Sequence, residues 1–161
     1  MNENDLIDTI LAGKRRRFLA KHPIYHTSSR ATEMELFQIA QNLNCKLTPG
    51  LSKWLLTAGY GDIEHSLSFR KDAFCLLSDG PLQGVVVFAH DDQDNIYAYD
   101  PEDGAIYFVS SSDKGYARLT DDFCGFLQEL VKRDYDLATW RDSLTLQQSG
   151  AADDALPQEV A

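Results

Sequence analysis

The sequence predicts an α+β domain, in which an antiparallel multi-strand sheet with a central meander packs against N-terminal helices and a C-terminal helix. The meander is the clearest signal, because residues 84–110 hold three apolar runs separated by two short acidic connections. Asp, Asn, Pro and Gly fill those connections, as expected for turns. Helical apolar spacing precedes and follows this block. Separate helical and strand blocks indicate α+β rather than βαβ alternation.

Length and composition favour one domain. The chain has 161 residues, 43% of them hydrophobic, and a mean hydropathy of −0.33. No apolar run approaches the ~20 residues of a membrane span, so we expect no membrane partner. The N-terminal charges follow the apolar residues, unlike a secretory signal, which predicts a cytoplasmic protein. Three widely spaced cysteines predict reduced, mostly buried thiols.

The first 30 residues are expected to form an N-terminal helix and a linker outside the main domain. Leu6, Ile7, Ile10 and Leu11 have helical spacing, and the basic run 14–17 is interpreted as the solvated end of that helix. Residues 22–30 are interpreted as the linker. His22 and His26 are four residues apart, but Pro23 disfavours a shared helix face and no metal site is expected.

The domain itself is predicted to span residues 31–144 and to begin with two helices. Thr32 caps the first, which runs to Asn44. Thr48 caps the second, Pro49 is its first residue, and Gly59 ends it. Its buried stripe consists of Leu51, Trp54, Leu55 and Ala58.

The remaining elements are shorter strands and a strong final helix. Strands are expected at 66–69 and 73–77, then in the meander at 85–89, 96–99 and 105–109, and finally at 116–119. Residues 120–122 cap a helix with one apolar face, made by Phe123, Phe126, Leu127, Leu130 and Val131. Residues 134–144 continue as helix or turn, with Trp140 packing back. Residues 145–161 are interpreted as a disordered tail.

The net charge of −10 is unevenly distributed. Residues 1–30 carry a charge of +3, and the rest of the chain carries −13. An acidic body disfavours nucleic-acid binding by the main domain and suits a basic protein partner. Acidity that serves only solubility is the alternative.

Three segments in this order resemble the SUKH superfamily, which includes fungal cell-wall synthesis regulators and bacterial toxin-immunity proteins. The first is MELFQIAQNLNCKLTPGLSKWLLTAG, the second VVVFAHDDQDNIYAYDPEDGAIYFV, and the third LTDDFCGFLQEL. The similarity covers about residues 32–133. The chain departs from the family pattern where Thr48 separates Leu47 from Pro49 and where the glycine turn reads Ala58-Gly59-Tyr60-Gly61.

The resemblance implies a non-enzymatic protein-binding domain, an immunity protein that neutralises a cognate bacterial toxin domain, with a basic nuclease as one such partner. The alternative is a regulatory or scaffold protein of the same fold, which docks through its basic N-terminal segment. A monomer or a homodimer without a cofactor is expected. An enzyme rests only on His90 beside Asp91 and Asp92, or on Cys75 with His65, and neither set is coherent.

The expected partner surface lies at the two acidic turns of the meander and on the strand between them. Its residues are Asp91, Asp92, Asp94, Tyr97, Tyr99, Asp100, Glu102 and Asp103. The turns lie at opposite ends of the middle strand and therefore make two patches. The two tyrosines share one face of that strand. They are either interface anchors or buried under a helix.

Overall fold

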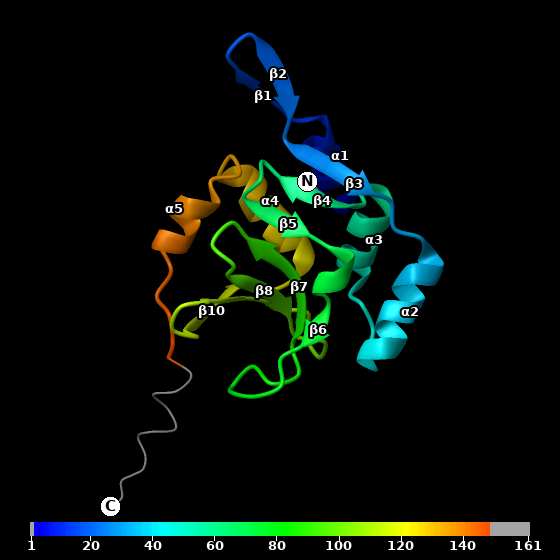
Figure 1. The fold of residues 1–161 in the computed structure, drawn as a ribbon, viewed down its shortest axis with the longest axis vertical. Coiled ribbons are helices and arrows are strands. Elements are labelled where there is room, and N and C mark those ends of the chain that lie inside the picture. Colours follow the sequence, from blue (N-terminus) through cyan, green and yellow to red (C-terminus); the bar gives the residue numbers. More distant parts are fainter. Residues whose placement is uncertain (1, 149–161) are drawn as a thin grey trace, which may run out of the picture.

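The computed structural model describes residues 2–148 and shows helices packed on a large antiparallel sheet (Figure 1). The helices are α1 (Glu3–Ala12), α2 (Glu33–Leu43), α3 (Pro49–Thr57), the 3₁₀ turn η1 (Lys71–Ala73), α4 (Phe123–Lys132) and α5 (Leu137–Asp142). The strands are β1 (Lys14–Arg17), β2 (Ala20–Pro23), β3 (Tyr25–Ser29), β4 (Tyr60–Ile63), β5 (Leu67–Phe69), β6 (Cys75–Leu76), β7 (Val86–Asp91), β8 (Ile96–Tyr99), β9 (Ile106–Val109) and β10 (Tyr116–Thr120). The predicted α+β class is confirmed.

The main sheet has eight strands, and all of its pairs are antiparallel. Seven of them follow the order β10-β9-β8-β7-β5-β4-β3, and β6 pairs with β7 beside that path. The predicted meander is confirmed as β7-β8-β9, and β10 extends it. Ile96 pairs with both His90 and Val109. This register places the two acidic turns at opposite ends of β8.

The core lies between one face of the sheet and helices α1, α3 and α4. Phe126 of α4 is fully buried at its centre. Its ring centroid lies 5.8 Å from that of Phe88, 6.0 Å from that of Tyr97 and 5.8 Å from that of Trp140. The opposite face of the central strands carries a smaller apolar cluster around Val85, Val87 and Ala98.

The capping predictions for the helices are confirmed. Thr32 and Glu35 form a reciprocal capping box at α2. Thr48 accepts a hydrogen bond from the backbone N–H of Leu51, with Pro49 as the first residue of α3. Asp122 caps α4 through the backbone N–H of Gly125. These side chains satisfy N–H groups that the first turn of each helix leaves without a partner.

The first 30 residues are not a helix and linker outside the domain. α1 buries Leu6, Ile7 and Ile10 in the core, and the expected linker contains β3, an edge strand of the main sheet. The basic run 14–17 is not a helix end either, because α1 stops at Ala12 and the run forms β1. β1 pairs with β2 in a separate hairpin that projects from the body (Figure 1).

Two smaller expectations also change. Cys75 lies exposed on the short strand β6, and Cys45 and Cys124 are only half-buried, so the thiols are not mostly buried. At the other end, Gln147 forms a β-bridge with Tyr116. The expected disordered tail therefore begins with residues held against β10, and its part from 149 to 161 lies outside the described residues. Across residues 2–148, none of the helices has the length and apolar character that a bilayer crossing needs.

Candidate functional site

The first acidic turn is organised around the Asp91 carboxylate, whose side chain is completely buried. Backbone N–H groups of Gln93 and Asn95 donate to Oδ1 at 2.9 and 3.0 Å. The Asn95 side-chain amide and the Tyr97 hydroxyl donate to Oδ2 at 3.0 and 2.8 Å. Arg141 Nη1 lies 3.0 Å from the same oxygen. Asp91 thus joins the turn, strand β8 and helix α5.

The network shifts the pKa values of its members in opposite directions. Burial alone raises the pKa of Asp91, but hydrogen bonds from Asn95, Gln93 and Tyr97 and the Arg141 guanidinium together hold it below its ordinary value. Burial, together with the Asp91 charge, raises the pKa of the Tyr97 hydroxyl far above its ordinary value. Asp91 is therefore a structural carboxylate and Tyr97 a neutral donor.

Three residues that were predicted to lie on the partner surface are buried in the domain instead. Asp91 is 6% exposed, and Tyr97 and Tyr99 are each 1% exposed. Tyr97 packs against Phe126 of α4, and the Tyr99 hydroxyl donates to the Lys46 carbonyl at 3.0 Å. The tyrosine face of β8 lies under a helix, which is the alternative stated for these residues.

The other predicted residues remain at the surface, but not all carry a free charge. Asp92 bonds to Arg141 Nη1 at 2.9 Å, and Asp103 lies 3.9 Å from Arg118. Asp94, Asp100 and Glu102 make no ion pair with any residue between 2 and 148. Unpaired carboxylates are therefore present at both turns.

The second acidic turn borders a hollow of about 460 Å³, here called the acidic hollow. It lies between this turn, the N-termini of α3 and α4, and α1. Its charged lining residues are Glu3, Lys46, Asp103 and Asp122, so acidic groups outnumber basic ones. Leu47, Pro49 and Phe123 add apolar lining. Neither α1 nor α4 was expected to contribute to this surface.

The catalytic candidates form no bonded pair within residues 2–148. Asp91 is committed to the network above, and no hydrogen bond or ion pair joins the His90 side chain to another residue in the described range. Cys75 is exposed on β6, whereas His65 lies in the β4–β5 turn and stacks on His26 with ring centroids 5.3 Å apart. His90 and Asp91 do line one hollow of about 300 Å³, but within residues 2–148 no bond links that histidine to a carboxylate, and the Cys75–His65 pair is not brought together.

The histidines of the N-terminal segment line a hollow of about 210 Å³ at the base of the hairpin, together with Arg17, Pro23, Glu64 and His65. His22 lies on β2 and His26 on β3, so they do not share a helix. Over residues 2–148, no group of three or more metal-ligating side chains is positioned to hold a metal ion.

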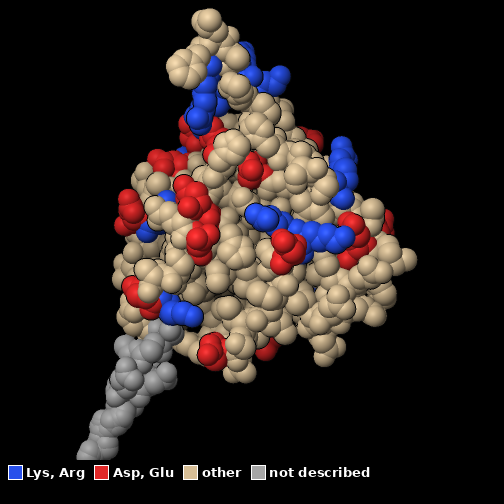
Figure 2. All heavy atoms as spheres, in the orientation of Figure 1, with Lys and Arg blue, Asp and Glu red and all other residues tan. Residues whose placement is uncertain are grey.

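The feature that the sequence prediction missed is the β1–β2 hairpin, here called the arm. At its tip Phe18 and Leu19 are 99% and 96% exposed, and Phe18 has a φ of 55°. Figure 2 shows the basic residues gathered along the arm and an uncharged tip beyond them. No Asp or Glu occurs between Asp8 and Glu33. This local excess of positive charge could have been recognised from the sequence alone.

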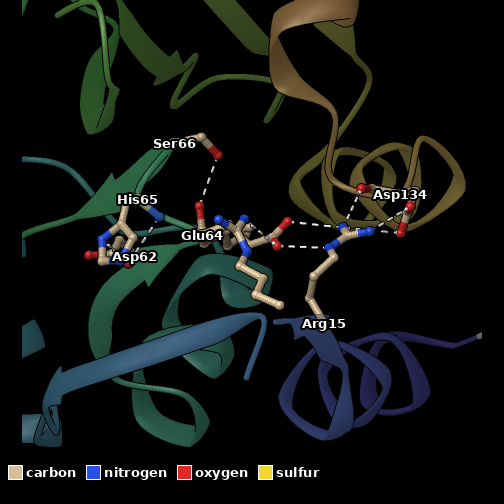
Figure 3. Close-up of polar contacts among 8 residues, drawn as sticks. Arg15, Asp62, Glu64, His65, Ser66 and Asp134 are labelled. Carbon is tan, nitrogen blue, oxygen red and sulfur yellow. Dashed lines mark hydrogen bonds and ion pairs between the residues drawn. The ribbon is translucent and has the colours of Figure 1, made fainter. Parts of the chain in front are cut away.

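Arg15 anchors the arm to the body, as Figure 3 shows. Its guanidinium donates to both carboxylate oxygens of Glu64, at 2.9 and 3.0 Å, and to Asp134 Oδ2 at 2.9 Å. Arg17 adds a longer contact to Glu64 at 3.4 Å. Glu64 and Asp134 both have positive φ values, so two tight turns present these carboxylates to the arm. Bidentate pairing fixes direction as well as distance.

In comparisons with protein-family models, curated proteins and solved structures, nothing matches this chain.

Proposed function

We propose that the chain is a non-enzymatic protein-binding domain that acts as an immunity protein and neutralises a cognate toxin domain carrying basic residues. The observation that carries the proposal is the acidic hollow beside the second meander turn. A basic side chain entering this hollow would meet Asp103, Asp122 and Glu3.

Within residues 2–148, Asp103 and Glu3 make only long ion pairs of 3.9 Å, to Arg118 and Lys53, and the Asp122 side chain accepts one backbone hydrogen bond at the start of α4. Asp100 and Glu102, which flank the lining residue Pro101 in the sequence and make no ion pair within residues 2–148, would speed the encounter. The resemblance to SUKH proteins supplies the expectation of a toxin as partner.

The test is co-expression of the chain with the toxin domain that the proposal expects to be encoded beside it, with rescue of cell growth as the readout. The variant Asp100→Asn/Glu102→Gln/Asp103→Asn removes three charges and retains side-chain oxygens for the turn, where Asp100 and Asp103 accept backbone hydrogen bonds. We expect this variant to lose rescue and to bind the toxin more weakly, with a smaller salt dependence.

The matched control is Asp72→Asn/Asp79→Asn/Asp113→Asn, which removes the same charge from exposed positions on η1 and on two loops outside the acidic hollow. Full rescue by the hollow variant, or equal loss in the control, would contradict the proposal. Asp91 does not belong in this test, because its loss would destabilise the fold rather than remove surface charge.

The arm favours a second candidate, a regulatory or scaffold protein of the same fold that docks through its basic segment. Deletion of residues 1–30 cannot separate the two functions, since it would remove three core residues of α1 and the edge strand β3. Substitution at the exposed tip, Phe18→Ser/Leu19→Ser, can separate them. Retained toxin binding by that variant would favour immunity, and loss of all partner binding would favour the scaffold.

A further inference from the structure

The arm has two faces with different uses. Paired residues of adjacent strands point to the same side of a hairpin, and consecutive residues alternate. Arg16 pairs with Lys21 and Lys14 with Pro23, whereas Arg15 and Arg17 lie on the other face. That other face carries the ion pairs to the body. Lys14, Arg16 and Lys21 therefore share the outer face, where they are exposed and make no ion pair within residues 2–148.

The two side chains at the tip are not part of the core formed by residues 2–148. Phe18 and Leu19 are almost fully exposed, and Phe18 adopts a left-handed backbone conformation that a bulky side chain disfavours. Gly would suit this turn position better. Two adjacent apolar side chains exposed at the end of a hairpin, one of them in an unfavourable backbone conformation, indicate a role in contact with something else.

We propose that the arm docks on the surface of an anionic lipid bilayer. Phe18 and Leu19 enter the boundary between headgroups and acyl chains, and Lys14, Arg16 and Lys21 face the lipid phosphates. This is a peripheral contact and needs no membrane-spanning helix. It revises the expectation of no membrane partner, which rested on the absence of an apolar span.

The acidic body does not prevent this contact. The two carboxylates that touch the arm, Glu64 and Asp134, are already paired with Arg15. Each arm strand has four residues, which places the tip roughly 13 Å beyond the base of the hairpin. That distance exceeds the Debye length of about 8 Å at physiological ionic strength. The bilayer would therefore respond mainly to Arg16 and Lys21, the outer-face cations nearest the tip, and least to Lys14 at the base.

A bilayer fits the arm better than a nucleic acid does. Phe18 and Leu19 carry no hydrogen-bonding side-chain group that could read a base edge. Three free cations are few for a nucleic-acid footprint on a protein whose net charge is −10. A fluid hydrocarbon boundary, by contrast, accepts an apolar tip without a matching pocket.

The experiment is flotation of the full chain with phosphatidylcholine vesicles, with and without phosphatidylglycerol. We expect partition only into the anionic vesicles, falling as salt rises. Lys14→Gln/Arg16→Gln/Lys21→Gln should weaken partition at least about 25-fold, from roughly fivefold for each of the two cations near the tip. Phe18→Ser/Leu19→Ser should weaken it at least about tenfold. The control Arg30→Gln/Lys46→Gln/Lys132→Gln makes the same charge change on the body and should stay within about twofold.

Phe18→Gly separates binding from folding, since it relieves the left-handed conformation while removing the ring. It should keep or raise the thermal midpoint and still lose vesicle binding. Absence of wild-type flotation, or flotation unchanged by the tip variants, would overturn the proposal. So would tip-dependent self-association in sedimentation, or tip-dependent binding to duplex DNA, without vesicle binding. The arm and the acidic hollow lie on different elements, so either proposal can fail alone.

Discussion

Replacement of Asp91 by Ala is expected to destabilise the domain more than replacement of any other acidic residue of the meander. The buried carboxylate accepts four hydrogen bonds and pairs with Arg141 at 3.0 Å. Each buried donor left without a partner costs about 1–3 kcal/mol. Removal of one member of a buried ion pair costs about 3–5 kcal/mol.

These costs do not add, because Arg141 keeps its contact with Asp92 and water can reach part of the emptied site. We therefore expect Asp91→Ala to lower the free energy of unfolding by about 3–5 kcal/mol. That is a large fraction of the ~5–15 kcal/mol typical of a domain. The effect should appear as a lower urea midpoint with an unchanged slope.

The assay is urea unfolding followed by tryptophan fluorescence, since Trp54 and Trp140 are both buried. Asp92→Ala is the control, because this neighbour binds the same arginine but has a half-exposed side chain. Its loss should cost under about 1 kcal/mol. Equal effects of the two substitutions, or a loss below about 1 kcal/mol for Asp91→Ala, would refute the assignment of Asp91 as the organising residue of the turn.

Three further outcomes are expected. Phe126→Ala should cost about 3–5 kcal/mol in the same urea titration, because it empties the centre of the aromatic core; a loss under about 1 kcal/mol would contradict this placement. Arg15→Met should speed amide hydrogen exchange across residues 14–23 while α1 stays protected, because it frees the arm from Glu64 and Asp134; equal acceleration in α1 would contradict a local anchor. Asp91 has a lowered pKa in the folded state, so its contribution to the free energy of unfolding is present above about pH 4 and is lost as the pH falls through the folded-state pKa. Asp91→Asn should therefore weaken the loss of stability at acidic pH. An unchanged loss of stability would show that other groups cause it.

Elements with strong periodicity or standard turn chemistry were predictable from the sequence. The apolar face of α4 has regular helical spacing, and Thr32, Thr48 and Asp122 are ordinary capping residues. The meander combines β-branched and aromatic runs with Asp and Gly turns. Each of these signals is local, so it can be recognised in the sequence without knowledge of the tertiary structure.

Both missed hairpins lack the residues that normally mark a tight turn. The β1–β2 turn uses Phe18 and Leu19, and the β4–β5 turn places Glu64 and His65 at positive φ. Asn-Gly or Asp-Gly would be the usual choice at such positions. Because no Gly or Asn marks a turn after the basic run 14–17, that run was interpreted as the end of a helix rather than as a strand. Tertiary contacts, above all the Arg15–Glu64 pair, specify these turns instead.

The candidate site was only partly predictable, because a carboxylate in a turn can either be buried and hydrogen-bonded within the fold or be exposed to a partner. Asp91 lies in the same acidic run as Asp94, yet one is fully bonded in the interior and the other is exposed. Asp91 is held by its neighbours Gln93, Asn95 and Tyr97, and Arg141, which is 50 residues away in the sequence, completes the set. The acidic hollow likewise draws Glu3 and Asp122 from distant helices. Such long-range partners leave no local pattern to read.

The two proposed contacts lie at opposite ends of the sheet, and this separation has a functional consequence. Leu67 pairs with Asp91, so the β4–β5 turn that anchors the arm lies at the same end as the first acidic turn. The acidic hollow borders the second turn, at the other end of β8. A bilayer bound by the arm would therefore leave the hollow directed away from the lipid and open to a protein partner. Vesicle-bound protein should bind the proposed toxin partner with undiminished affinity, whereas competition between vesicles and that partner would show that the two surfaces overlap.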